Sequence, residues 1–246
     1  MMSRQRQRIY FLICAVLLAV IGVAGWNVAS ILLEYRAGEQ TYAQIAKISR
    51  SEPEADTPII NDGAAARDFS ALQKINPNIV AWVSIPGTNI EYPVVQGADN
   101  SYYLTHLVTG EWNSSGSIFL DHAASPDFSD SYSIVYGHNM LNKTMFSSLM
   151  DYKTQDFYQA HPTGILETPQ RNYEILFFAG FVADTDHPVW NTNLQTESVA
   201  EWGAEMYRHS YFQSNILPSA DDCLIALATC SYEFDNARFI LLGILR

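Results

Sequence analysis

The sequence predicts a mostly β domain with peripheral helices, and two features of the chain carry this prediction. Short runs of apolar, β-branched and aromatic residues alternate with turns that contain Gly or Pro, which is typical of a β-barrel-like sheet. Helical patterns are few, and the clearest cover residues 68–74 and 144–152. The sequence has no internal repeats. Periodicity alone therefore favours one mixed, mostly β domain, which we place at residues 67–246.

The N-terminal end is interpreted as a membrane anchor. Residues 9–33 contain no charged side chain and are long enough to cross a bilayer, and Arg4, Arg6 and Arg8 precede them. Basic residues favour the cytoplasmic side, so we expect residues 1–8 in the cytoplasm and the remaining domain outside the cell, as a single-pass protein. A cleaved signal peptide is the alternative, because small residues lie in the second half of the stretch. The apolar stretch nevertheless exceeds the about 7–15 residues of a signal peptide core.

Residues 34–66 are expected to form a helical stalk and a linker between the anchor and the domain. Residues 39–48 can extend the membrane helix outward. Residues 51–58 combine Pro, Ser, Thr and acidic side chains, which is typical of a polar tether. The anchor is thus predicted to lead into the domain through a helix and then an irregular segment.

Two late strands are predicted to meet in a hairpin that carries a reactive thiol. The apolar runs 224–228 and 239–242 read as buried strands, and the polar segment 231–237 reads as the turn between them. Cys230 closes the first strand and Arg238 opens the second, so the two are neighbours in an antiparallel pair. A guanidinium near a sulfur favours the nucleophilic thiolate. The alternative is a cysteine that only packs and an arginine that caps a sheet edge.

The positions of the three cysteines distinguish a thiol that only packs from a thiol that can react. Cys14 lies inside the apolar span, which leaves Cys223 and Cys230 for the outer domain. On one strand these two are separated by roughly 23 Å at about 3.3 Å per residue, whereas a disulfide needs a Cα separation of about 4.4–6.8 Å. Their odd spacing also points them to opposite faces of the sheet. We therefore interpret Cys223 as a packing residue and Cys230 as a free thiol kept for chemistry.

Two motifs in the chain resemble those of the sortases. The segment Ala226-Leu227-Ala228-Thr229-Cys230, followed by Arg238, is similar to the T-L-x-T-C motif with its later arginine, although Ala226 replaces the first Thr. The segment Tyr136-Gly137-His138-Asn139 resembles the Y-G-H-N motif of this family. His138 and Cys230 are far apart in the sequence, so only the fold can bring them together, as is normal for a Cys/His pair.

The resemblance is closest to class B sortases and covers nearly all of the chain beyond the anchor. Segments 75–96, 99–104 and 116–121 are similar to class B stretches, with Pro86-Gly87 as a turn. The family carries a long insert with a helix, here between Asp184 and Asp222, where the pattern Ser198-Val-Ala-Glu201 predicts a capping box. The resemblance implies an eight-stranded β-barrel with Cys230, His138 and Arg238 at one mouth.

The resemblance also implies an activity. Cys230 would attack the Thr carbonyl of an N-P-x-T-x sorting signal on a surface protein and form a thioacyl-enzyme, with His138 as general acid and Arg238 holding the substrate or the oxyanion. The acceptor would be an amine of a peptidoglycan precursor, or a pilin lysine in a pilin-polymerising enzyme. The remaining expected substrate contacts are Tyr136, Asn100, Leu104, Thr229 and Ser231, the last through its backbone N–H.

Other functions are weighed against this one. The formal net charge of −12 argues against nucleic acid as a partner. No cofactor and no zinc site are expected, because the other histidines lack metal-ligand spacing; they are His106, His122, His161, His187 and His209. A papain-like hydrolase remains an alternative, but its cysteine lies early in the domain at a helix start. An anchored assembly factor with a dead site is the non-enzymatic alternative.

Overall fold

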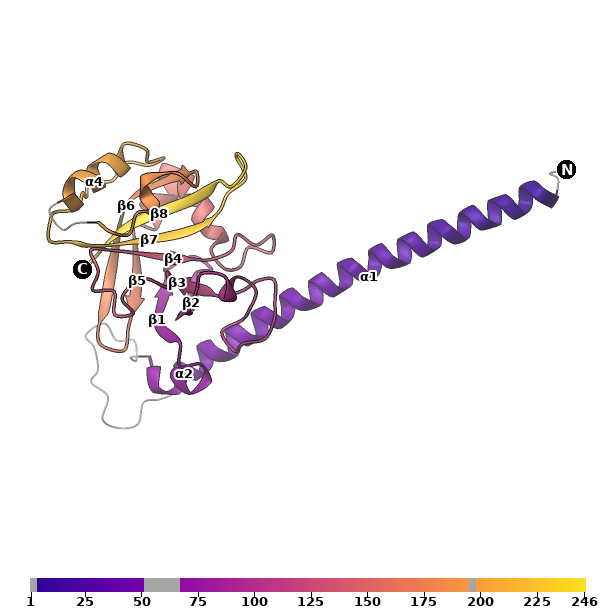
Figure 1. Cartoon of the computed structure of the whole chain (residues 1–246), viewed down its shortest axis with the longest axis horizontal. Helices are drawn as coiled ribbons and strands as arrows, with labels where there is room; N and C mark the ends of the chain where they lie inside the picture. Colours follow the sequence, from indigo (N-terminus) through magenta and orange to yellow (C-terminus); the bar gives the residue numbers. More distant parts are fainter. Residues whose placement is uncertain (1–3, 51–66, 195–197) are drawn as a thin grey trace.

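The strands of the chain close into a barrel, from which a long N-terminal helix projects (Figure 1). The computed structural model describes residues 4–50, 67–194 and 198–246. The strand order is β1-β2-β3-β4-β7-β8-β6-β5, and most neighbours are antiparallel. The strands are β1 Ile79–Ser84, β2 Glu91–Gln96, β3 Ile118–Leu120, β4 Tyr132–Tyr136, β5 Thr163–Glu167, β6 Asn172–Ala183, β7 Cys223–Cys230 and β8 Arg238–Leu245. The predicted eight-stranded barrel is confirmed.

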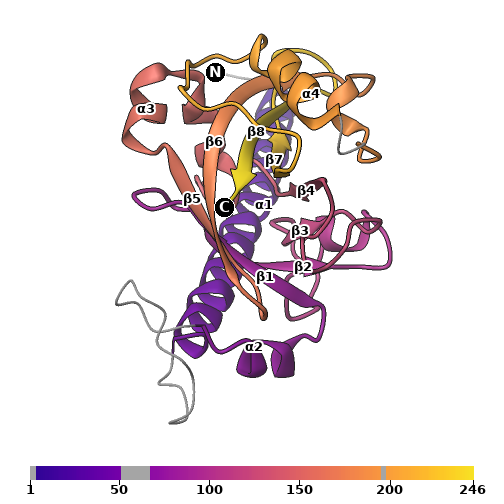
Figure 2. The ribbon, with the colours of Figure 1, turned by 90° about the vertical axis from the view of Figure 1, so that its left-hand side faces the viewer.

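Short helices surround the barrel (Figure 2). They are α2 Phe69–Ile75, η1 Tyr102–Leu104, η2 Ser147–Lys153, α3 Gln155–Ala160, η3 Pro188–Trp190 and α4 Val199–Tyr207. The Asp68 side chain caps α2 by accepting a hydrogen bond from the Ala71 N–H at 2.9 Å. The helix expected at 144–152 is the 3₁₀ helix η2, which begins three residues later. The insert carries α4 as expected, but the expected capping box is not formed, because the Ser198 side chain makes no capping hydrogen bond.

Half of the barrel wall is buried on both of its faces. Along β7, Ile225 and Leu227 face the barrel interior, whereas Leu224, Ala226 and Ala228 face an outer layer. The outer layer includes Val199 and Met206 of α4, and the Trp202 ring lies 4.8 Å from the Tyr132 ring of β4. Strands buried on both faces read as continuous apolar runs, which is how β7 and β8 appear in the sequence. By the strand alternation, Cys230 and Arg238 belong to the outer face.

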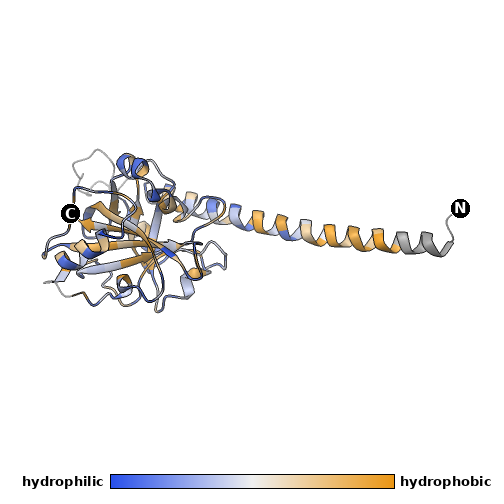
Figure 3. Cartoon of the chain, turned by 90° about the horizontal axis from the view of Figure 1, so that it is seen from above, coloured by the Kyte–Doolittle hydropathy of each residue, from blue (hydrophilic) through white to orange (hydrophobic). Residues whose placement is uncertain are grey.

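The N-terminal helix α1, Arg4–Ile48, has an exposed apolar part and a docked part. Its described side chains from Leu12 to Leu33 are all exposed, and this part is apolar in Figure 3. The helix is long and apolar enough to cross a membrane, by length and composition. Beyond it, Tyr42 and Ile45 are buried against the barrel at 7% and 2% exposure.

The segment expected to be a stalk and linker is thus helical as far as Ile48, and it packs on the barrel. The Tyr42 hydroxyl donates a hydrogen bond to the Gly116 carbonyl, and Ile45 belongs to the main hydrophobic core. The expected tether at 51–58 lies outside the described residues. The division of the chain into four parts stays a prediction, but α1 and the barrel share one interface.

Candidate active site

Strand register brings the three expected catalytic residues to one end of the barrel. β4 and β7 are parallel neighbours in which Tyr136 pairs with Ala228, and the Gly137 N–H donates to the Ala228 carbonyl at 3.0 Å. Two residues further along each strand, His138 lies level with Cys230. On the other side of β7, Cys230 is the direct antiparallel partner of Arg238. Cys230 therefore lies between an imidazole and a guanidinium.

The environment of Cys230 favours its thiolate. The side chain is partly exposed at the end of β7. Its hydrogen bond with His138 lowers the pKa of the thiol, partial burial opposes this, and the Arg238 charge lowers the pKa further. The same hydrogen bond is the main reason that the pKa of His138 is raised. The two groups form a coupled pair in which the hydrogen bond favours the thiolate of Cys230 and the imidazolium of His138.

A backbone carbonyl orients His138. The Nε2 atom of His138 lies 2.7 Å from the Leu104 carbonyl oxygen. Because a carbonyl can only accept, Nε2 carries a proton, which leaves Nδ1 available for the thiol. This bond also favours the imidazolium and contributes to the raised pKa of His138. Leu104, expected as a substrate contact, thus holds the histidine through its backbone, while its side chain is 40% exposed.

The residues that flank His138 explain why the motif has this composition. A Cβ on Gly137 would lie 2.4 Å from Ile118 Cδ1 and 2.7 Å from the Phe146 ring, so only glycine allows this close packing. The Asn139 side chain donates to the Cys230 carbonyl at 3.0 Å. It therefore fastens the histidine strand to the cysteine strand and does not orient the imidazole. This arrangement differs from the one that a papain-like enzyme requires.

The turn between β7 and β8 supplies a charged network and corrects one expectation. The Ser231 N–H donates to the Ala237 carbonyl at 2.9 Å, so it is engaged and does not act as the expected oxyanion donor in this state. Glu233 accepts hydrogen bonds from Lys153 and the Ser231 hydroxyl. Although partial burial opposes it, these bonds lower the pKa of Glu233 to about 2. Arg238 uses one N–H on the Ala237 carbonyl at 3.0 Å.

Two other expected substrate contacts have structural partners, and a third is buried. The Asn100 side chain donates to Asp121 at 2.8 Å, and its oxygen accepts from the His122 N–H at 2.9 Å. The Tyr136 hydroxyl donates to the same Asp121 carboxylate at 3.0 Å. Thr229 is 2% exposed and its hydroxyl is buried, which argues against a side-chain contact with a peptide at the surface. Sequence reasoning missed Asp121, although the residue ends a segment that it had singled out.

Comparison with known proteins decides the family. The family model described as the sortase domain matches residues 83–245, which is well over half of the chain. The chain belongs to the sortase family. A curated sortase B of Listeria monocytogenes is 34% identical over 92% of this chain and 93% of its own length. These matches place the chain in class B.

Solved class B structures share the fold of this sortase. A Bacillus anthracis protein described as similar to sortase B is 28% identical and superposes with a TM-score of 0.75 over 86% of this chain and 96% of its own. A Staphylococcus aureus sortase B–substrate complex is 29% identical, with a TM-score of 0.69 over 72% of this chain and 84% of its own. Among the residues described for this sortase, no group of three His, Cys, Asp or Glu side chains could hold a metal ion.

Proposed function

We propose that this sortase is a membrane-anchored cysteine transpeptidase that cleaves a C-terminal sorting signal of the N-P-x-T-x type after its Thr. It would then transfer the surface protein to an amine of a peptidoglycan precursor. The observation that carries the proposal is the position of Cys230, level with His138 of the parallel neighbour on one side and paired with Arg238 on the other. A paired thiolate and imidazolium supply both the nucleophile and the proton that peptide cleavage needs.

In the first half-reaction, the Cys230 thiolate attacks the Thr carbonyl and forms a C–S bond. Arg238 stabilises the negative charge that develops on the carbonyl oxygen. The imidazolium of His138 gives its proton to the leaving amine, the C–N bond breaks, and a thioester remains. With Nε2 held by the Leu104 carbonyl, Nδ1 is the nitrogen placed for this transfer.

In the second half-reaction, the acceptor amine attacks the thioester carbonyl. Neutral His138 takes the proton that the amine loses, the new amide forms, and Cys230 leaves as the thiolate. The enzyme thereby returns to its starting state with no net change of charge. The thioester preserves most of the energy of the cleaved amide, so a new amide can form without another energy source.

The anchor fits a substrate that is itself at the membrane. We assign residues 9–33 to the bilayer, residues 1–8 with their arginines to the cytoplasm, and the barrel to the outer face. The β7–β8 turn projects on the side of the barrel from which the apolar part of α1 leaves (Figure 1). This placement brings the catalytic end toward the membrane, where a newly exported protein arrives.

A peptide library combined with candidate amines tests the proposal. The full-length protein in lipid nanodiscs is mixed with N-P-x-T-x peptides and with oligoglycine, diaminopimelate-containing and lysine-bearing acceptors, and the products are read by mass spectrometry. Products cleaved after Thr and joined to a peptidoglycan-type amine support it. A preference for a pilin lysine would redirect the acceptor. Hydrolysis alone, or no labelling of Cys230 by a vinyl sulfone, would argue for a hydrolase or a dead site.

A further inference from the structure

The docked part of α1 contacts both chain segments that flank His138. One segment is the loop that ends at Gly116 and Ser117, next to the carbonyl that holds the imidazole. The other is the loop 139–146, which directly follows the histidine. We propose that residues 34–48 of α1 position His138 for catalysis and that Tyr42 is the principal positioning residue. This inference rests on the proposed role of His138, and it adds a function for the helix beyond anchoring.

The first contact runs through the Tyr42 hydroxyl. This hydroxyl is buried, donates to the Gly116 carbonyl at 2.7 Å and lies 3.1 Å from Ser117 Oγ. The Ser117 hydroxyl in turn donates to the His106 carbonyl at 2.8 Å, and the Ser117 N–H donates to the Tyr103 carbonyl at 2.9 Å. Tyr42 therefore fixes a loop whose backbone lies directly against the segment 103–106.

Gly116 links the Tyr42 contact to the carbonyl that holds His138. Its φ is +56°, and a Cβ there would lie only 2.6 Å from the carbonyl oxygens of Tyr103 and Leu104. The Gly116 backbone is thus pressed against the Leu104 carbonyl, the group that accepts from His138 Nε2 at 2.7 Å. A shift of Gly116 must either move that carbonyl or leave it room to rotate. The position of the imidazole therefore depends on the hydroxyl of Tyr42.

The second contact reaches the other side of His138. Glu39 of α1 accepts a hydrogen bond from the Asn142 side chain at 2.8 Å. The loop 139–146 closes on itself, since the Phe146 N–H donates to the His138 carbonyl at 2.9 Å. Its Met145 N–H donates to the Tyr92 hydroxyl at 3.0 Å.

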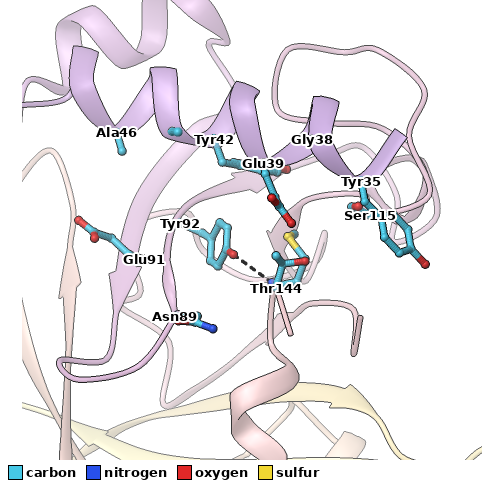
Figure 4. Close-up of a pocket in the computed structure, with 12 residues that line it drawn as sticks. Tyr35, Gly38, Glu39, Tyr42, Ala46, Asn89, Glu91, Tyr92, Ser115 and Thr144 are labelled. Carbon is cyan, nitrogen blue, oxygen red and sulfur yellow. Dashed lines mark hydrogen bonds between the residues drawn. The ribbon is translucent and has the colours of Figure 1, made fainter. Parts of the chain in front are cut away.

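The interface between α1 and the barrel is not packed throughout. A pocket of about 250 Å³ lies there, lined by residues of α1, β2 and both loops, among them Glu39, Tyr42, Tyr92, Ser115 and Thr144 (Figure 4). The Tyr42 and Tyr92 rings meet edge to face at 5.3 Å between their centroids. Because this pocket interrupts apolar packing, polar contacts carry much of the alignment. They are those of Tyr42 and Glu39, together with the Glu34 carbonyl, which accepts from the Asn113 side chain at 3.0 Å. Removing one hydroxyl should then loosen the histidine without detaching the helix.

The experiment compares Tyr42→Phe with Tyr152→Phe in the full-length protein in nanodiscs. Tyr152 is a matched control, because its buried hydroxyl also donates to a backbone carbonyl at 2.7 Å, that of His161. Both variants lose a buried hydroxyl that donates to a backbone carbonyl, so both should lower the melting temperature. Only Tyr42→Phe should reduce kcat, by about three- to tenfold, while KM changes little. Glu39→Ala should act in the same direction with a smaller effect.

The decisive measurement is the titration of the His138 side chain itself. It is monitored by NMR of the protein with isotope-labelled histidine, and the His138 signal is assigned as the one that is missing in His138→Gln. The Leu104 carbonyl raises the pKa of His138, so a loosened carbonyl should lower it. Tyr42→Phe should therefore shift the His138 midpoint to lower pH, and Tyr152→Phe should not. The basic limb of the rate profile should move in the same direction.

The two readings keep the inference separate from the proposed function. If no amine or peptide is turned over, the proposed function fails, but the titration still reports on the position of His138. The positioning role is overturned if neither Tyr42→Phe nor Glu39→Ala changes the His138 titration, while Tyr42→Phe loses about as much stability as Tyr152→Phe. Equal shifts in Tyr42→Phe and Tyr152→Phe would also overturn it, because they would show a general response to destabilisation.

Discussion

Cys223 and Cys230 stand at the two ends of the same strand, β7, and neither is fully buried. Burial raises the pKa of the Cys223 thiol, whereas the hydrogen bond from His138 lowers the pKa of the Cys230 thiol. Cys223 pairs across the ladder with Leu245, and Cys230 pairs with Arg238. The difference teaches that the partners at a strand end decide whether a thiol is reactive, since residue type and strand are the same for both.

The largest expected effect comes from removing each thiol in turn. Cys230→Ala should abolish turnover, because no other described side chain at this end of the barrel can form the thioester. Cys223→Ala should be nearly silent, since it lies at the opposite end of β7 and only packs. Product formation by mass spectrometry and circular dichroism of both variants provide the check. Equal losses of activity with unchanged dichroism would remove the distinction between the two cysteines.

Removing His138, the hydrogen-bonding partner of Cys230, should separate acid catalysis from thiol activation. In His138→Ala the leaving amine receives no proton, so peptide cleavage should fall by about 10²–10⁴-fold. The Cys230 thiol should still react with a small electrophile that carries a good leaving group. If the variant fails with both substrates, His138 mainly sets the ionisation of the thiol. Normal peptide cleavage would exclude His138 from the mechanism.

Arg238, the partner of Cys230 in the antiparallel ladder, should contribute to activity through the shape of its side chain as well as through its charge. Arg238→Lys keeps the positive charge but loses the planar fork that can bind two oxygens, so activity should fall by at least about tenfold. The comparison is made on kcat/KM with one sorting peptide. Near-normal rates would mean that Arg238 acts on the thiolate only as a point charge.

The smallest expected effect is a difference in thiol titration. Because the pKa of Cys230 is lowered and that of Cys223 is raised, Cys230 should be alkylated at a lower pH than Cys223. The rate of turnover should follow a bell against pH, and its two limbs should belong to the coupled Cys230–His138 pair rather than to either residue alone. Peptide mapping after brief iodoacetamide treatment gives both midpoints. A reversed order would contradict the electrostatic account of the site.

The hairpin β7–β8 and its residues could be predicted from the sequence because its information is local. A short polar turn between two apolar runs sets the antiparallel register, and that register puts Cys230 opposite Arg238. The helix α2 was equally predictable, since the expected range 68–74 lies within one residue of its observed bounds. His138 required the motif resemblance, since the parallel pairing of β4 with β7 joins segments that are distant in the chain.

Side-chain patterns by themselves thus determined the β class of this protein, its apolar N-terminal helix and the thiol with its facing arginine. Tertiary structure alone decided that the Leu104 carbonyl orients His138, that the Ser231 N–H is engaged by Ala237, and that α1 docks through Tyr42. The physical reason is that every residue carries the same carbonyl and nearly every residue the same N–H. No amino-acid pattern marks which of them meets a catalytic group; only the packing of distant segments selects it.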